Sequence, residues 1–364
     1  MTAPRLEIDL DKIHHNAATL VRLLANRGVA VTAITKATLG SPEIAGVFHQ
    51  AGLREIGDSR IENIKRMRSA GLEATFSLIR SPMPSEVPSV VRHADLSFNS
   101  ELAVIRLLSA AATQNGRTHG IVLMVELGDL REGIMPNDLE SLVAQILDLP
   151  GIVLRGLGTN LACQHGVQPD ATNMAMLSSL VDSIENGFER TLEIVTGGNS
   201  GNLQWALNGG EIGRINNLRL GESILLGRET LHRRPLNGLH RDAFTLVAEV
   251  IESKVKPSQP WGELAQTAFG PSPSVPDRGS ICRTILAIGH QDTDPSGLEP
   301  PLGVTILGAS SDHLITETTE CLTVGTEISF HLNYSALVRA MTSPYIAQIH
   351  HHRRPMPPKN NPIK

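Results

Sequence analysis

The sequence predicts an α/β fold, a (β/α)8 TIM barrel followed by a smaller, mostly β domain. Eight short apolar segments alternate with helical patterns at intervals of roughly 20–40 residues, a spacing typical of parallel strands joined by crossover helices. After about residue 235 the helical patterns end, and proline and glycine cluster between strand-like segments. We expect the barrel over residues 11–234, the β domain over 1–10 and 235–345, and a disordered tail over 346–364.

The predicted barrel strands are rich in valine, isoleucine and leucine, as strands buried on both faces of a parallel sheet usually are. Their ranges are 30–36, 54–58, 75–79, 95–99, 120–127, 152–160, 192–197 and 217–221. Helix starts lie between them. Ser41 and Pro42 are spaced as an N-cap and a first helical residue, and Ser59 and Glu62 as a capping box.

The predicted β domain has no long helices between its strands. Its strands are expected at 246–251, 282–288, 304–307, 313–316 and 327–331. The segment 5–10 also has the pattern of a strand, and it precedes the barrel in the chain. We expect it to join the β domain.

Composition limits the classes of partner. The formal net charge is −5 and no basic stripe occurs, which disfavours nucleic acid and anionic membrane. No apolar run approaches the roughly 20 residues that cross a bilayer, and the N-terminus lacks a signal core, so we expect a cytoplasmic protein. The three cysteines, Cys163, Cys282 and Cys321, form no CxxC pair and are expected to be buried free thiols in a reducing cytosol.

Several polar residues fall where the strands of a barrel end, which is where barrel enzymes place their active sites. Lys36 ends the first strand. A lysine there has a depressed pKa and makes a good Schiff-base nucleophile, although a salt-bridged structural lysine is the alternative. The turn 196–201 is rich in glycine and suits an anion such as phosphate. Arg219 lies on the eighth strand, facing either the barrel mouth or a surface ion pair, and Arg131 lies in a charged loop that can bind a carboxylate.

Ordered motifs along the chain carry a resemblance to a known family. They are Asp-Ser-Arg-Ile-Glu-Asn at 58–63, Asn-Ser-Glu-Leu at 99–102, Leu-Gly-Asp-Leu-Arg-Glu-Gly at 127–133, Gly-Gly-Asn-Ser at 197–200, Leu-Arg-Leu-Gly-Glu-Ser at 218–223 and Gly-His-Gln-Asp at 289–292. In these motifs the sequence resembles the fold-type III enzymes of the alanine racemase superfamily, which depend on pyridoxal 5′-phosphate, and most of all the ornithine racemases. The resemblance runs from about residue 5 to 345 and leaves out the tail.

The resemblance implies a role for each matching residue. Lys36 matches the lysine that binds pyridoxal phosphate, and Arg219 the arginine that faces the pyridine nitrogen and disfavours its protonation. Arg131 matches the arginine near the cofactor phenolate and the substrate carboxylate. The remaining residues expected to bind the cofactor are Asn160, Asn199, Ser200, Gly221, Glu222 and Tyr345.

One departure concerns the second catalytic base. Alanine racemases carry a tyrosine in a Gly-Tyr-Ala-Asp segment, and the corresponding segment here is Gly-His-Gln-Asp at 289–292. His290 is therefore the replacement candidate, and the alternative is a polar strand residue without a role in proton transfer. Asp292 and Asp312 are expected to bind substrate.

The resemblance implies an amino-acid racemase that acts by two-base transfer of the Cα proton through an external aldimine, with Lys36 and His290 as the bases. A head-to-tail homodimer is expected, with His290 donated by the partner subunit. Ornithine or a similar basic amino acid is the expected substrate. The alternatives are an alanine or broad-specificity racemase, a non-catalytic protein of pyridoxal phosphate homeostasis, and a decarboxylase, against which Arg219 argues.

Overall fold

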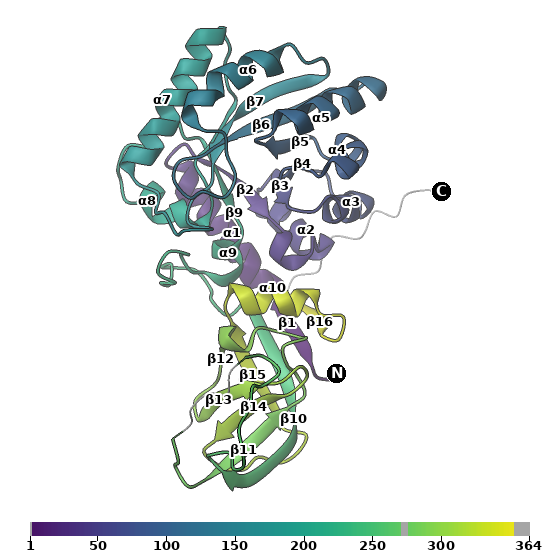
Figure 1. Ribbon diagram of the computed structural model, residues 1–364, viewed down its shortest axis with the longest axis vertical. Helices are drawn as coiled ribbons and strands as arrows, with labels where there is room; N and C mark the ends of the chain where they lie inside the picture. Colours follow the sequence, from purple (N-terminus) through teal and green to yellow (C-terminus); the bar gives the residue numbers. More distant parts are fainter. Residues whose placement is uncertain (1, 271–275, 353–364) are drawn as a thin grey trace. The chain divides into compact units, whose positions relative to one another are not determined.

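A computed structural model describes residues 2–270 and 276–352 of the chain (Figure 1). The chain divides into two compact units. One consists of Lys12–Arg241, and the other joins the N-terminal residues up to Asp11 to the segment that begins at Asp242. No helix among the described residues is long and apolar enough to cross a membrane.

The first unit is a closed parallel barrel of eight strands, and Figure 1 shows helices around its outside. The strands are β2 (Ala30–Ile34), β3 (Glu55–Asp58), β4 (Thr75–Leu78), β5 (Leu96–Asn99), β6 (His119–Val125), β7 (Ile152–Thr159), β8 (Ile194–Thr196) and β9 (Asn217–Leu220). The barrel closes where β2 pairs with β9, with Ala30 opposite Asn217. All eight predicted strands are confirmed, each within about two residues of its expected ends.

The helices follow their strands as the crossover pattern predicts. They are α1 (Leu10–Ala25), α2 (Pro42–Gln50), α3 (Ile61–Ser69), α4 (Val87–His93), α5 (Leu102–Gln114), α6 (Leu139–Leu147), α7 (Ala171–Phe188), α8 (Leu203–Leu207) and α9 (Glu222–Leu226). Short 3₁₀ turns η1 (Lys36–Thr38) and η4 (Ser200–Asn202) open the connections after β2 and β8.

One of the two predicted helix caps is confirmed, and the other is wrong. The Ser41 side chain accepts a hydrogen bond from the Ile44 backbone N–H at the start of α2, as predicted. The capping box expected from Ser59 and Glu62 is wrong, because Arg60 is the N-cap of α3 and has no side-chain cap bond. The carboxylate of Asp58 accepts the Arg60 backbone N–H instead, at 2.9 Å.

The barrel interior is tightly packed, and Gly156 on β7 shows how closely its strands approach. A Cβ atom at this position would lie 1.8 Å from the Ile194 carbonyl oxygen of β8, so no larger residue fits. His119 at the start of β6 is buried, with its Nε2 atom 2.8 Å from the Ser97 hydroxyl. Burial lowers the pKa of His119 to about 4, although Asp95 opposes that shift.

The second unit is built on an antiparallel sheet with the order β12-β15-β10-β11-β14-β13. Its elements are β1 (Arg5–Asp9), β10 (Phe244–Pro257), β11 (Ser280–Leu286), β12 (Leu298–Glu299), β13 (Val304–Ala309), β14 (Leu314–Thr318), β15 (Glu327–Leu332), α10 (Tyr334–Thr342) and β16 (Ala347–His351). The N-terminal strand β1 pairs with β10, with Leu6 opposite Leu246. Segment 5–10 therefore belongs to the sheet of the second unit, as expected.

Two predictions about this unit are wrong. The chain was expected to be disordered from residue 346, but β16 pairs in parallel with β1 from Arg5–Ala347 to Asp9–His351. Residues 353–364 of the expected tail lie outside the described residues. The second wrong prediction concerns the thiols, because Cys282 and Cys321 form a disulfide and Cys163 alone is free and exposed.

Candidate active site

The carboxyl end of the barrel gathers the polar residues that the sequence singled out in the first unit. Lys36 opens η1, directly after β2 and Thr35, and Asn160 follows β7. Asn199 precedes η4, and Arg219 lies within β9. Because parallel strands end at one rim of a barrel, these side chains share a single mouth.

Backbone strain also concentrates at this rim. Among the described residues, five other than glycine have a left-handed backbone. Glu189 ends α7, and the other four are Leu39 at φ 52°, Leu130 at φ 51°, Ala162 at φ 58° and Arg233 at φ 61°. Leu39, Leu130 and Ala162 are within three residues of Lys36, Arg131 or Cys163. Left-handed conformations cost of order 1 kcal/mol or more for such residues, and they cluster at functional sites.

Arg219 is the most buried cation of the mouth, with only 4% of its surface exposed. Its guanidinium donates to the Thr196 hydroxyl at 2.6 Å, to the Thr159 carbonyl at 2.8 Å and to the Asn160 side-chain oxygen at 3.3 Å. It also lies 5.2 Å from the centroid of the Phe98 ring. Burial lowers the pKa of Arg219 to about 10, so the group remains a fixed cation at neutral pH.

Lys36 is exposed at the mouth, so its amine is accessible to a ligand. The surrounding protein nevertheless lowers the pKa of its ammonium below the ordinary value, first by burial and then through the cations of Arg131 and Arg219. The preceding residue, Thr35, is fixed by a hydrogen bond from its hydroxyl to the Asp58 carboxylate at 2.7 Å. The lowered pKa makes the uncharged amine easier to reach, and that is the form that attacks a carbonyl carbon or accepts a proton.

A buried carboxylate clamps two loops of the mouth together. Asp129, fully buried, accepts backbone N–H groups from Cys163 at 3.0 Å and Gln164 at 2.8 Å, as well as from His165 and Val167. Burial by itself raises the pKa of Asp129, but these donors outweigh it and the pKa is lowered. The clamp holds the free thiol of Cys163 beside the Asn199 amide, which donates to its sulfur at 3.5 Å.

The glycine-rich turn after β8 is shaped by its asparagines. The Asn199 side chain accepts the Gly201 backbone N–H at 2.7 Å, and Asn199 N–H donates to the Asn202 side chain at 3.0 Å. Ser200 then lies with its hydroxyl 3.0 Å from that of Ser223, in the first turn of α9. Two buried hydroxyls and the starts of two helical turns therefore meet at one point, an arrangement that suits an anion.

Two amide side chains of the barrel have a buried polar atom without a hydrogen-bond partner among the described residues. They are the Nδ2 donor of Asn160 and the Oδ1 acceptor of Asn99, at the ends of β7 and β5. An unpaired buried polar atom costs about 1–3 kcal/mol. Such atoms at the mouth of a barrel fit a polar ligand that completes their bonding.

The two remaining charged groups of the mouth are already paired. Arg131, exposed, forms a bidentate ion pair with its neighbour Glu132, and Glu222 pairs with Arg233. Burial raises the pKa of Glu222, and the nearby Arg233 and Lys36 cations oppose the shift. Gly221, also predicted to bind the cofactor, is the N-cap of α9, directly beside this carboxylate.

The other predicted site residues belong to the second unit. His290 occupies a turn whose backbone is anchored by His290 N–H to the Ser310 carbonyl at 3.0 Å. Asp292 is buried, and its oxygens accept the Gly289 N–H and the Ser343 hydroxyl, both at 3.0 Å, so its carboxylate is engaged within the turn. Asp312 is exposed and pairs with His313 at 2.8 Å, and Tyr345 is exposed as well.

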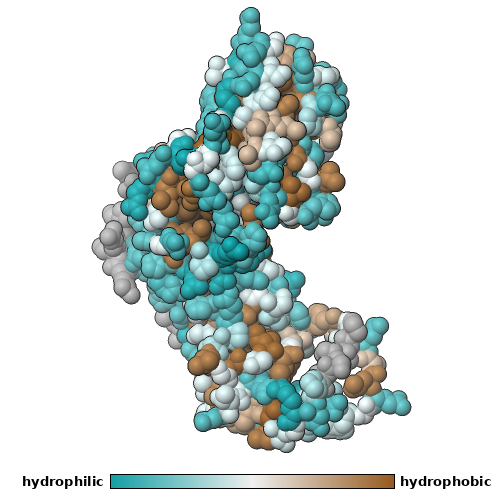
Figure 2. Space-filling view, turned by 90° about the vertical axis from the view of Figure 1, so that its left-hand side faces the viewer, coloured by the Kyte–Doolittle hydropathy of each residue, from teal (hydrophilic) through white to brown (hydrophobic). Residues whose placement is uncertain are grey.

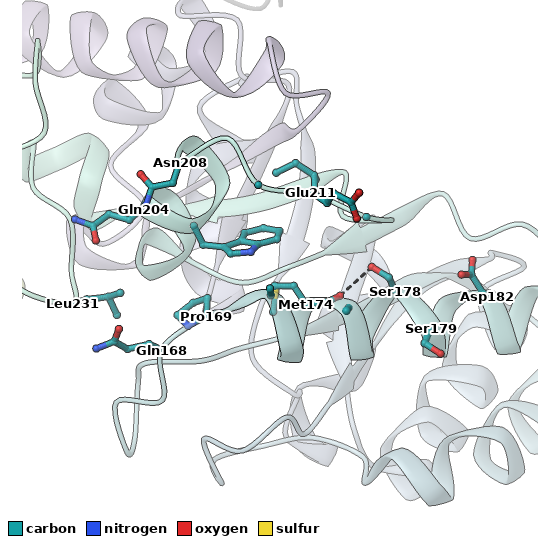
Figure 3. Close-up of a pocket in the computed structure, with 16 residues that line it drawn as sticks. Gln168, Pro169, Met174, Ser178, Ser179, Asp182, Gln204, Asn208, Glu211 and Leu231 are labelled. Atoms are coloured by element: carbon teal, nitrogen blue, oxygen red, sulfur yellow. Dashed lines mark hydrogen bonds between the residues drawn. The ribbon is translucent and has the colours of Figure 1, made fainter.

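A groove of about 920 Å³ lies on the barrel unit between α7, α8 and the segment 208–213 (Figure 3). Its wall includes Met174 and Ser178, joined by a hydrogen bond from the Ser178 hydroxyl to the Met174 carbonyl at 3.0 Å. None of the predicted site residues lines it. The groove is therefore separate from the predicted site.

The structure adds residues to the mouth that the sequence did not single out for chemistry. They are Cys163, Ser223, Glu132 and Asn99. Ser223 and Glu132 adjoin predicted residues in the chain and could have been found by that adjacency. Cys163 is placed by the clamp from Asp129, 34 residues away, and no sequence signal shows that contact.

The fold and the mouth together define a class of protein: (β/α)8 barrel enzymes with a β domain, a strand-end lysine and a glycine-rich turn near the last strands. The family described as alanine racemase, N-terminal domain, matches residues 8–228. The chain belongs to this family.

Two relatives match over nearly their whole lengths. The lysine racemase of Thermotoga maritima is 38% identical over 354 residues, covering 96% of this chain and 99% of that protein. The ornithine racemase of Acetoanaerobium sticklandii is 39% identical over 349 residues, covering 94% and 98%. Among solved structures, the alanine racemase of Streptomyces lavendulae covers 97% of this chain and 98% of its own, with a TM-score of 0.74 and 18% identity, which supports the fold.

Proposed function

We propose that this protein is a pyridoxal 5′-phosphate-dependent racemase of a basic amino acid such as ornithine or lysine. The observation that carries the proposal is the full-length likeness to a lysine racemase and an ornithine racemase, each at about 38–39% identity. Enzymes that share a fold differ in function, so the residues of the mouth must also fit the chemistry.

The mouth offers partners for each end of the proposed cofactor. Lys36 supplies an accessible amine with a lowered pKa for the aldehyde carbon. The Ser200 and Ser223 hydroxyls, with Asn199 and the backbone at Gly221, suit a phosphate. The unpaired Nδ2 atom of Asn160 is a donor that still lacks an acceptor among the described residues.

When bound, pyridoxal phosphate withdraws electrons from an attached amino acid and so acidifies its Cα–H bond. Arg219 is a cation fixed by three hydrogen bonds. It would keep the pyridine nitrogen unprotonated, because two positive charges would otherwise lie close together. This limits the electron withdrawal. We infer that Arg219 favours return of a proton to Cα over side reactions.

Racemisation requires a proton acceptor on each face of Cα. Lys36, whose pKa is lowered by burial, is proposed to take or return the proton on one face. His290 is proposed for the other face, as His290 of the partner subunit in a head-to-tail dimer. The anchored turn from Gly289 to Thr293 gives this imidazole a defined backbone.

A distal ammonium requires an acidic partner, since burying it unpaired costs several kcal/mol. Four carboxylates are candidates, namely Asp129, Glu222, Asp292 and Asp312. Asp129 is saturated by backbone donors, and Asp292 accepts the Gly289 N–H and the Ser343 hydroxyl. Glu222 and Asp312 remain, each paired with one side chain that can be exchanged. We propose one of these two as the partner of the substrate side chain.

The proposal is tested by incubating the protein with pyridoxal phosphate and L-ornithine or L-lysine, followed by chiral chromatography. We expect the D-enantiomer to accumulate to an equal mixture, because enantiomers have equal free energy. Borohydride reduction and peptide mapping should place the pyridoxyl group on Lys36, and Lys36→Ala should abolish turnover. Labelling of Lys65, Lys254 or Lys256 instead would contradict the proposed site.

A further inference from the structure

The chain between β10 and β11 forms a closed excursion of the second unit, of which residues 258–270 and 276–279 are described. Ser258, fully buried, closes its base: its N–H donates to the Gly279 carbonyl at 2.8 Å, and its hydroxyl accepts the Arg278 N–H at 2.7 Å. The hydrogen bonds of Ser258 therefore hold the two ends of the excursion together.

The excursion carries a tight turn from Thr267 to Gly270. The Thr267 N–H and hydroxyl both donate to the Gly270 carbonyl, at 2.8 and 2.9 Å, and the Phe269 N–H donates to the Thr267 hydroxyl at 3.2 Å. Gly270 has φ 122°, a conformation that disfavours other residues. Phe269 is thus held at the tip of a hydrogen-bonded turn, with 54% of its surface exposed.

The Phe269 ring lies against the imidazole of His290. The two ring centroids are 4.1 Å apart and the ring planes are inclined by 33°. The His290 backbone is fixed by the bond to Ser310, and the adjacent Gly289 is so enclosed that a Cβ atom would lie 2.4 Å from the Asp312 nitrogen. The backbone leaves the rotation of the imidazole free, and the contact with Phe269 restricts it.

We propose that Phe269 is a positioning residue for racemisation, which holds the His290 ring in the orientation that exchanges a proton with Cα. This inference rests on the proposed role of His290 as the second base. The π face of Phe269 also attracts the imidazolium that exists while His290 holds the Cα proton. Loss of the ring should therefore impair the proton transfers on one face of Cα and spare those of Lys36.

A matched control lies on the same excursion. Trp261 is also aromatic and is 82% exposed, and Figure 2 shows apolar side chains at the surface of this unit. Trp261→Ala removes a comparable exposed apolar surface. Phe269→Tyr retains a ring at the tip of the turn and should retain function.

The experiment follows ornithine in D₂O with the holoenzyme, measuring inversion by chiral chromatography and Cα–H exchange with retention by mass spectrometry. In Phe269→Ala, inversion should slow by roughly tenfold in both directions, as loss of an aromatic pair would produce. Exchange with retention should persist for the enantiomer whose proton Lys36 removes. The ratio of exchange to inversion for that enantiomer should therefore rise about tenfold, while Phe269→Tyr and Trp261→Ala stay near wild type.

Equal ratios in Phe269→Ala and Trp261→Ala would overturn the positioning role. If His290→Ala leaves inversion unchanged, the second-base assignment fails and this inference fails with it, although racemase activity itself stands. Phe269→Leu keeps apolar volume without a ring and tests the contact where Phe269→Ala is unstable. In the protein labelled at the histidine Cε1 atoms, the ring-current shift of His290 should disappear in Phe269→Leu, and an unchanged shift would refute the stacking.

Discussion

Arg219 fixes the charge at the centre of the barrel mouth. It is buried, held by Thr159, Asn160 and Thr196, and remains protonated at neutral pH because its pKa falls only to about 10. In the proposed reaction its charge limits electron withdrawal by the cofactor. The identity of the charge at this position should therefore decide between racemisation and side reactions.

Replacement of Arg219 by Glu should slow racemisation by about 10- to 100-fold, because an acid favours a protonated pyridine. It should also raise the share of events that release a 2-oxo acid and leave the amino group on the cofactor as pyridoxamine phosphate. Arg219→Lys changes the side chain at the same buried position but keeps its positive charge, so it is the matched control. Product analysis by chromatography measures both quantities. If Arg219→Glu and Arg219→Lys give the same product ratio, the charge of Arg219 does not act on the ring.

His119 makes the stability of the barrel depend on pH. Its pKa is about 4 in the folded barrel and about 6.5 unfolded, so the unfolded chain binds more protons between these values. The free energy of unfolding should be highest above pH 6.5 and should fall by about 3 kcal/mol as pH drops toward 4. His119→Gln should remove this part of the slope in urea denaturation series. An unchanged slope would mean that another group causes the acid lability.

Site residues at strand ends could be predicted from the sequence, whereas contacts made through loop conformation could not. Lys36 and Arg219 were placed at the mouth because strand positions can be counted along the chain. Asp129 lies in the charged motif at 127–133, and the structure shows its carboxylate saturated by backbone donors from 163–167. Contacts of this kind depend on loop conformation, and residue type does not determine them.

At the scale of elements, the disulfide between Cys282 and Cys321 is the largest departure from expectation. Cys282 lies on β11 and Cys321 just beyond β14, and these strands pair with Cys282 opposite Thr318. The pairing could not be predicted, because the register of antiparallel strands is set by turns and packing far from either cysteine. A disulfide fits an oxidising compartment better than a reducing one, and the cytoplasmic location remains a prediction.

Breaking this disulfide should destabilise the second unit. The cysteines are separated by 39 residues, and the chain-entropy estimate for such a loop is about 4 kcal/mol. Dithiothreitol should therefore lower the Tm of the wild type, while the Cys282→Ser, Cys321→Ser double variant should have a low Tm with or without it. A wild-type Tm unaffected by complete reduction would show that the bond adds little.

Other elements of the second unit show why short strands escape prediction. The strand β16 has the sequence Ala-Gln-Ile-His-His, which lacks an apolar alternation, and it forms because β1 provides a parallel partner. The helix α10 has its N-cap at Asn333, whose side chain accepts the Ala336 N–H, but it was not expected in a mostly β domain. Tertiary pairing overrides weak local signals in both cases.

For the whole molecule, we predict that two subunits build each complete site. Protomers with Lys36→Ala and His290→Ala should be inactive alone and recover activity when mixed, because a hybrid dimer rebuilds one intact site. Random assortment gives at most about a quarter of wild-type activity. Sedimentation should show twice the 39.2 kDa of the chain. Absence of recovery in verified hybrids would exclude shared sites built from these two residues.

We propose a racemase in which Glu222 or Asp312 pairs with the distal ammonium of the substrate. The direct test compares kcat/KM for ornithine and norvaline, which fills similar space without the charge. A site built for an ammonium should favour ornithine by about 10³-fold or more, since norvaline cannot form the ion pair with the acid. A kcat/KM for norvaline or alanine equal to that for ornithine would contradict the claim and indicate an alanine or broad-specificity racemase.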